Sequence, residues 1–225
     1  MQRRQFTRAT LAAAAWGLPL AARSALGMDD AAAGVRAALQ RGAASAVDLL
    51  GRNDGFLGNP KVRIPLPGML EDAAKLLSRL GQKKRVDELV TAMNRAAEQA
   101  VPEAKELLLA TVGALSVEDA LSIVRGGPTS VTDFFARKTR EPLGVKFLPI
   151  VTRATEKVQL AERYNAFASK AAGLGLLKGE DANLQQHVTA KALDGLYLMI
   201  GEEEQRIRAD PVKTGSEILR KVFAR

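Results

Sequence analysis

Apolar residues recur along most of the chain with the spacing of amphipathic helices. They return every three or four positions over 84–112, 147–168 and 183–209, and this period predicts a buried helical face in each segment. Helices are expected at 29–50, 69–80, 84–112, 116–126, from 130 onward, 147–168, 183–209 and 211–223. The pattern predicts an all-α fold, a single multi-helix bundle over residues 28–225.

Polar residues and prolines mark where these helices begin and break. Asp29 or Asp30 is expected to cap the first helix. Pro102 falls inside the 84–112 pattern, so we expect a kink or a split there.

Two segments have the spacing of a capping box, in which a serine opens a helix and an acidic residue follows three positions later. The first is Ser116 with Asp119, and the second is Ser130 with Asp133, directly after a glycine pair at 126–127. We therefore expect Ser116 and Ser130 to cap two successive helices.

Residues 56–66 have an extended rather than a helical pattern. Val62, Ile64 and Leu66 alternate with a basic residue and a proline, as apolar residues do along a strand. Prolines at 65 and 67 cannot donate to a sheet, which restricts the segment to an edge strand or a polyproline-like arm. We expect an extended, Pro-rich arm laid over the helices, with its three apolar side chains buried.

The first 27 residues are typical of an export signal. Three arginines within residues 3–8 precede an apolar stretch over 9–22, and no acidic residue occurs before Asp29. That stretch is shorter than the ~20 residues that a bilayer-spanning helix needs, and small residues up to Gly27 suit cleavage. The arginine pair also resembles a twin-arginine signal, with general secretion as the alternative. We expect an exported, periplasmic protein with no transmembrane segment after cleavage.

Composition narrows the functions that the chain can have. Aromatic residues make up 4% and apolar residues 47%, so the core must consist mainly of Ala, Leu, Val and Ile. The absence of cysteine excludes disulfides, thiolate metal sites and cysteine nucleophiles, and a single histidine excludes paired imidazoles. Signal removal leaves 29 basic and 25 acidic residues, which lowers the net charge from +8 to +4. With only short basic clusters, no nucleic-acid binding is expected.

Carboxylates are the main candidates for chemistry. An acid–base pair would need two of Asp119, Asp133 and Glu204 to face one cavity with their pKa values pushed apart. Helix capping is the alternative role for Asp119 and Asp133. The chain has no Glu-x-x-His step and no EF-hand spacing, so we expect no metal site and no cofactor.

Two further positions have a functional and a structural interpretation. His187 lies at the polar edge of the 183–209 stripe, and Asp194, two turns away, would orient its imidazole in a catalytic role. An ordinary surface position is the alternative. The glycine pair before Ser130 would present helix N–H groups to an anion, but a tight helix junction has the same sequence pattern.

Several motifs in combination resemble one known family. They are Asn59–Pro67, Val117–Ala120 with Gly126, Thr132–Phe135, Lys191–Leu196 and Glu203–Arg208. The family is a bacterial exported, all-helical domain of unknown function, number 4197, and the resemblance extends from about Gly34 to Phe223. It implies an envelope protein and supplies no activity, substrate or catalytic residue. His187 stands where this family is expected to have an aromatic residue, which weighs against a catalytic role.

These features favour a non-enzymatic envelope protein that binds a protein partner or an amphipathic or anionic ligand. The expected polar members of its site are Arg63, Asp119, Asp133, Arg137, Lys191, Asp194, Glu204 and Arg208. A carboxylate-dependent hydrolase or lyase is one alternative. The other is an oligomeric envelope scaffold, which would show an exposed apolar patch and a mass above 24.1 kDa.

Overall fold

The structure is a computed structural model that describes residues 20–156, 158–173 and 183–210. In chain order it contains α1 (Leu20–Leu50), α2 (Gly68–Arg79), α3 (Lys83–Ala100), the 3-10 helix η1 (Val101–Glu103), α4 (Ala104–Gly113), α5 (Val117–Arg125), α6 (Ser130–Thr155), α7 (Gln159–Gly173) and α8 (Leu184–Ala209). Regular secondary structure in these ranges is helical throughout, which confirms the predicted all-α fold. The predicted helix at 211–223 and the predicted loop after Gly173 lie outside the described residues.

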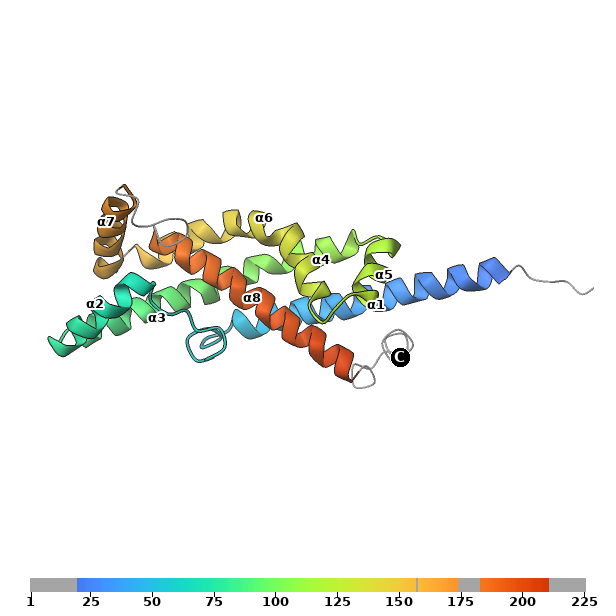
Figure 1. Ribbon diagram of the computed structural model, residues 1–225, viewed down its shortest axis with the longest axis horizontal. Helices are drawn as coiled ribbons and strands as arrows, with labels where there is room; N and C mark the ends of the chain where they lie inside the picture. Colours follow the sequence, from blue (N-terminus) through green and yellow to red (C-terminus); the bar gives the residue numbers. More distant parts are fainter. Residues whose placement is uncertain (1–19, 157, 174–182, 211–225) are drawn as a thin grey trace, which may run out of the picture.

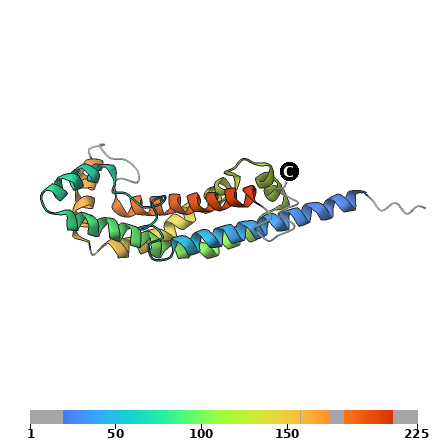
Figure 2. The same cartoon turned by 90° about the horizontal axis from the view of Figure 1, so that it is seen from below.

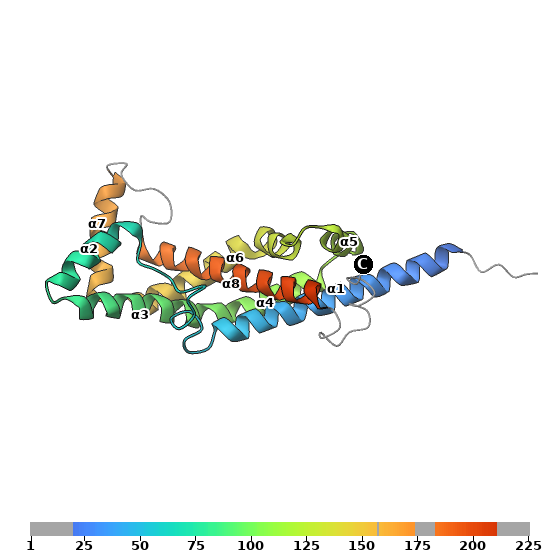
Figure 3. The ribbon, with the colours of Figure 1, turned by 60° about the horizontal axis from the view of Figure 1, so that its bottom comes forward.

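The helices form an elongated body (Figure 1). α3, η1 and α4 follow one another along its long axis, and α1 runs beside α4 (Figure 3). α8 lies over this layer and packs against α6, α1 and α3 (Figure 2). α2 and α7 lie at one end of the body, whereas α5 lies towards the other, so the two ends are built from different elements.

The core is aliphatic, as the composition predicts. Its largest fully buried side chains include Phe56, Phe135 and Phe147, and most of the others are Ala, Leu, Val and Ile. Buried residues from the 56–66 arm join those of the helices in one cluster. The arm is therefore part of the core, not an appendage.

Prolines affect the helices in two ways. Pro102 divides the predicted 84–112 helix into α3, η1 and α4, which confirms the expected break. Pro142 and Pro149 instead lie inside α6. Each removes one helical hydrogen bond, and this loss accounts for the curvature of α6 in Figure 1.

The predicted helix over 147–168 is wrong, because α6 ends at Thr155 and α7 begins at Gln159. The Thr155 hydroxyl donates to the Val151 carbonyl at 2.8 Å and accepts from the Gln185 amide of α8 at 3.1 Å. Hydroxyl bonds to the preceding turn favour bending, and the contact with α8 ties this helix end to the body. The break thus follows from a tertiary contact that the local periodicity does not contain.

The predicted cap at Asp29 or Asp30 is also wrong, since α1 begins earlier, at Leu20. Residues 20–28 are mostly Ala, Leu and Met, which have high helix propensity and carry the helix through the acidic pair. The observed start lies within the predicted signal peptide.

Residues 51–67 link α1 to α2 through turns and an extended stretch over 63–67. Val62 and Ile64 are buried, as predicted for the arm, whereas Leu66 is only partly buried. The arm lies against α3 and α8, and its backbone is hydrogen-bonded to side chains of α3.

Candidate functional site

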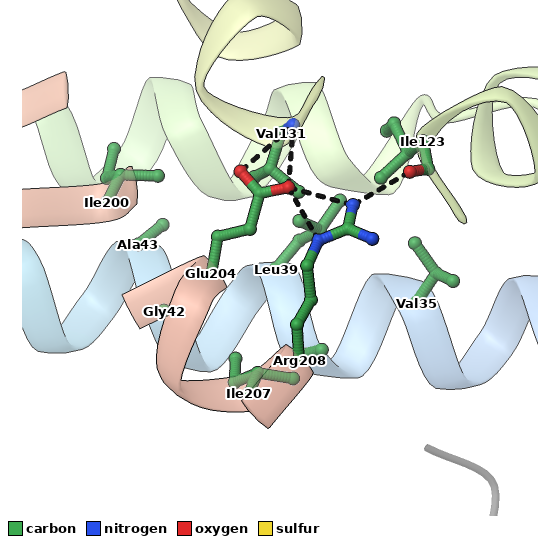
Figure 4. A pocket seen from close by; sticks show the side chains of 11 residues that line it. Val35, Leu39, Gly42, Ala43, Ile123, Val131, Ile200, Glu204, Ile207 and Arg208 are labelled. Carbon is green, nitrogen blue, oxygen red and sulfur yellow. Dashed lines mark hydrogen bonds and ion pairs between the residues drawn. The ribbon is translucent and has the colours of Figure 1, made fainter. Parts of the chain in front are cut away.

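A buried carboxylate, that of Glu204, lies near the C-terminal end of α8 with 2% of its side chain exposed. Its oxygens accept hydrogen bonds from the backbone N–H of Val131 at 3.2 and 3.3 Å (Figure 4). A further bond comes from the N–H of Thr132 at 3.4 Å. These N–H groups belong to the first turn of α6, where unsatisfied donors and the helix dipole favour an anion. Glu204 therefore caps α6 from a different helix.

Arg208, one turn further along α8, completes this cluster. Its guanidinium contacts the Glu204 carboxylate at 2.8 Å, the Ile123 carbonyl at 2.9 Å and the Ser130 hydroxyl at 2.8 Å. Ile123 lies near the C-terminal end of α5, where a cation is favourable. We call residues 123–131 the α5–α6 corner; the Glu204–Arg208 pair fastens it to α8.

The predicted role of Ser130 as a helix cap is wrong. Ser130 is the first residue of α6, and its hydroxyl donates to the Ile123 carbonyl at 2.8 Å. Thr129 takes the cap position, and its hydroxyl donates to Asp133 at 3.1 Å. The N–H groups considered for an external anion are occupied by Glu204, so the anion at this junction is a side chain of the protein itself.

A small cavity of about 20 Å³ lies beside the pair, between α1, α5, α6 and α8. A water molecule needs roughly 10–15 Å³, so the space suits about one water. Among the described residues that line it, Glu204 is the only carboxylate, and Asp119 and Asp133 lie elsewhere. The three candidate carboxylates therefore do not converge in this cavity.

Lys191 and Asp194 do meet, in a surface cluster with Arg140 of α6. Asp194 forms ion pairs with both cations, at 3.5 Å in the case of Lys191. All three side chains are between 42% and 45% exposed, and ion pairs with this exposure contribute about 0–1 kcal/mol. The cluster joins the surfaces of α6 and α8 and resembles an ordinary surface network.

Tyr197 lies beneath this cluster. Its hydroxyl is 2.9 Å from that of Thr139, and the Arg140 guanidinium lies 5.8 Å from the centre of its ring. Burial raises the pKa of Tyr197, against the opposing effects of the Thr139 hydrogen bond and the Arg140 charge. The Tyr197 phenol is therefore harder to ionise than that of a solvent-exposed tyrosine.

His187 is 5% exposed and faces the arm, with Nε2 at 3.2 Å from the Pro65 carbonyl. Asp194, which the sequence placed as the partner that orients it, is paired with Arg140 and Lys191 instead. The histidine thus links α8 to the arm.

The remaining candidates lie on helix surfaces. Asp119 is in the first turn of α5, where its N–H donates to the Ser116 hydroxyl at 3.0 Å, which confirms Ser116 as a cap. Asp133 and Arg137 are exposed on α6. The structure thus brings Glu204 together with Arg208 and Lys191 with Asp194. Asp133 and Arg137 lie one turn apart on α6, and Asp119 and Arg63 lie on other elements.

Arg63 lines a groove of about 870 Å³ between the arm and α2. We call it the arm–α2 groove; it is lined by Pro60, Arg63, Ile64, Pro65, Leu66, Glu71, Ala74, Lys75, Ser78, Arg79 and Val90. Its apolar members are partly or fully buried, except for the two prolines, whereas its charged members are exposed. Three cations face one carboxylate, so the groove combines an apolar floor with a basic rim.

The side chains of α3 that hold the backbone of the arm were not predicted from the sequence. The Asn94 amide accepts from the Ile64 N–H at 2.8 Å and donates to the Ile64 carbonyl at 3.1 Å. Glu98 accepts from the N–H groups of Phe56 and Leu57, both at 3.0 Å. Asn94 and Glu98 interrupt the alanine-rich apolar face of α3; that interruption was the available signal.

Arg95 completes the attachment of the arm. It contacts Glu98 at 2.6 Å and Asp54 at 2.8 Å, and the hydrogen bond with Glu98 raises the pKa of its guanidinium. The start of the arm is thereby fixed to α3 by a chain of charge-assisted bonds.

The described residues contain no cluster of three or more His, Cys, Asp or Glu side chains placed to hold a metal ion. Within the same ranges, no single helix is long and apolar enough to span a membrane. One pair of helical segments reaches that length and apolarity only when taken together: Lys83–Gly113 and Val117–Arg125, which are bent by 104° against each other.

The amino-acid sequence matches one described protein family. The sequence profile described as "Protein of unknown function (DUF4197)" matches residues 25–224. The chain belongs to this family. No curated protein and no solved structure matches the chain significantly. The DUF4197 match thus covers α1 from residue 25 onward and all of α2 to α8.

Proposed function

We propose that this DUF4197 protein is a non-enzymatic binding protein of the cell envelope, exported by its N-terminal signal. Its ligand is a single-chain amphiphile with an anionic head group, held in the arm–α2 groove. The observation that carries the proposal is the combination of a groove of about 870 Å³ with an apolar floor and a basic rim.

The floor of the groove suits an alkyl chain. Ile64 and Ala74 are buried, and Leu66 and Val90 are partly buried at its surface. Ligand sites usually occupy roughly 300–1,000 Å³ and are lined mainly by apolar side chains with a few polar groups. The groove falls in that range.

The rim suits an anionic head group. Arg63 lies on the arm and Arg79 at the end of α2, and both side chains are exposed. An Arg guanidinium offers a planar set of donors that matches carboxylate or phosphate oxygens. Glu71, at the same rim, would repel a second negative group, which favours a ligand with a single anionic head.

The other candidate residues support binding rather than catalysis. Glu204 and Arg208 hold the α5–α6 corner, and Lys191 and Asp194 belong to a surface network. A carboxylate-dependent enzyme would need two acids at one cavity, and Asp119, Asp133 and Glu204 have no such arrangement among the described cavities.

Calorimetric titration of the exported protein with decanoate tests the proposal, with decanol as the uncharged comparison. We expect saturable binding of decanoate, weaker binding of decanol, and a rise in Tm with decanoate because a ligand that binds only the folded state stabilises it. The R63Q/R79Q variant should lose at least tenfold in affinity for decanoate.

The matched control is R137Q/R153Q, which removes the same charge from exposed positions on α6. It should bind decanoate as the unmodified protein does. Equal losses in both variants, or no saturable binding by the unmodified protein, would contradict the proposal.

A further inference from the structure

The turn between α2 and α3 forms one extremity of the elongated body (Figures 1 and 2). We call residues 79–85 the tip. Leu80 is 67% exposed there, and Gly81 has a φ of 76°, the left-handed conformation that ends α2. The reversal of the chain thus presents a large apolar side chain to solvent at the end of the molecule.

The tip is also strongly basic. From Ala73 to Val86 the sequence contains five cations and no acidic residue, and an acidic pair borders this stretch on each side, at 71–72 and at 87–88. These are Lys75, Arg79, Lys83, Lys84 and Arg85, and all five are exposed. Val145, Leu148 and Leu198 are also exposed among the described residues, so the exposure of Leu80 is notable only together with its place in the turn at the end of the body and the cations around it.

We propose that the tip docks the protein on an anionic lipid surface, with Leu80 entering the interfacial layer and the surrounding cations contacting lipid phosphates. Peripheral membrane binding depends on this pairing of apolar side chains with basic residues. A nucleic acid is a poorer fit, because the tip has no aromatic residue to stack on bases and its leucine would stay exposed.

The charges of the tip determine how strongly it is expected to bind an anionic bilayer. Each Lys or Arg near an anionic bilayer strengthens binding by roughly fivefold, so three of them together account for about a hundredfold. Insertion of one leucine adds an apolar contribution that salt does not screen. The docking is therefore expected to weaken with salt without disappearing.

The inference goes beyond ligand binding in the arm–α2 groove and does not depend on it. Arg79 of the tip and the neighbouring Lys75 also line the groove, and the tests below leave both residues unchanged. A protein that fails to bind decanoate but sediments with vesicles would contradict the groove proposal alone, and the reverse result would contradict docking alone.

Vesicle co-sedimentation of the exported protein provides the first test. We expect binding to phosphatidylglycerol–phosphatidylcholine vesicles and more than about a hundredfold weaker binding to phosphatidylcholine alone, where none of the tip cations meets an anionic surface. The K83Q/K84Q/R85Q variant, which removes three of these cations, should lose about a hundredfold. The R137Q/K138Q/K146Q control, which removes equal charge from exposed positions on α6, should bind as the unmodified protein does. Equal losses in both variants would overturn the proposal.

A fluorescence experiment tests the insertion of Leu80. The only tryptophan, Trp16, lies in the predicted signal, so the exported L80W variant carries one reporter at the tip. We expect a blue shift on anionic vesicles and quenching by brominated lipids. Unchanged emission on vesicles that bind the protein would overturn insertion, and so would equal affinity of the tip for an oligonucleotide at the same salt concentration.

Discussion

At the scale of single residues, the arm is held by side chains that replace a missing strand partner. Asn94 both accepts from and donates to the backbone of Ile64, as a neighbouring strand would. Glu98 satisfies two successive N–H groups at the start of the arm. Because buried backbone groups need partners, these two side chains allow an extended segment to lie in a helical core.

Replacement of Asn94 by Ala is expected to destabilise the protein by about 3 kcal/mol, because the N–H and carbonyl of Ile64 would stay buried without partners. Denaturant unfolding of N94A measures this change. The control is Q99A, an exposed position on the same helix, for which a change within about 0.5 kcal/mol is expected. Equal stability of N94A and the unmodified protein would contradict this account of the arm.

The sequence could not predict these bonds, because each joins positions about 30 to 40 residues apart. It did predict an arm with buried Val62 and Ile64, since alternation and proline are local properties. A polar residue on the apolar face of a predicted helix shows that a partner exists, and the identity of that partner depends on the tertiary fold.

At the scale of elements, the sequence correctly predicted helix starts and breaks where they depend on bonds between neighbouring residues. Ser116 caps α5 and Pro102 divides α3 from α4, both as predicted. Ser130 failed as a cap because Glu204, from α8, already occupies the N–H groups of α6. Pro142 and Pro149 lie inside α6, where packing of that helix against α8 and α3 outweighs the loss of two hydrogen bonds.

Two glycines in helices differ in the space around them, so replacing each by alanine separates the effect of tight packing from the effect of helix propensity. A Cβ at Gly195 would lie 2.8 Å from the Phe56 ring and 3.2 Å from Val62, whereas one at Gly42 would lie 3.6 Å from Glu203. We expect G195A to destabilise the protein by about 1–3 kcal/mol and G42A to stabilise it by about 0.5–1 kcal/mol.

Thermal and denaturant unfolding of both glycine variants compare the effects directly. The same glycine-to-alanine substitution should change the free energy of unfolding in opposite directions at the two positions. If G195A stabilised the protein, the arm would have to move away from α8 at little cost, which would contradict the tight packing expected from the complete burial of Phe56.

At the scale of the whole molecule, the Glu204–Arg208 pair joins three helices at the end opposite the tip. We expect R208Q to cost about 3 kcal/mol, because it leaves the Glu204 carboxylate buried without its cation. The control is R206Q, which removes a 68% exposed guanidinium paired with Glu203 on the same helix. Glu203 keeps a hydrogen bond from Ser45, so the loss should cost less than about 1 kcal/mol.

A double-mutant cycle with E204Q tests the coupling of this pair. The E204Q/R208Q variant should be more stable than the sum of the single losses, because no buried charge remains. Additive effects in chemical unfolding would mean that the two side chains act independently.

The residues that line the arm–α2 groove were predicted only in part. Arg63 was selected from the sequence and lies in the arm–α2 groove, whereas Arg79 and the α2 wall were not selected. A groove between two elements has no local signature, because its depth depends on how those elements pack.

The contact between Phe56 and Gly195 also has an evolutionary consequence. A ring at one position occupies the volume that a side chain at the other would need, so neither can change freely while its counterpart stays the same. Homologous sequences with a larger residue at 195 should therefore carry a smaller one at 56, a covariation that links the first quarter of the chain to the last.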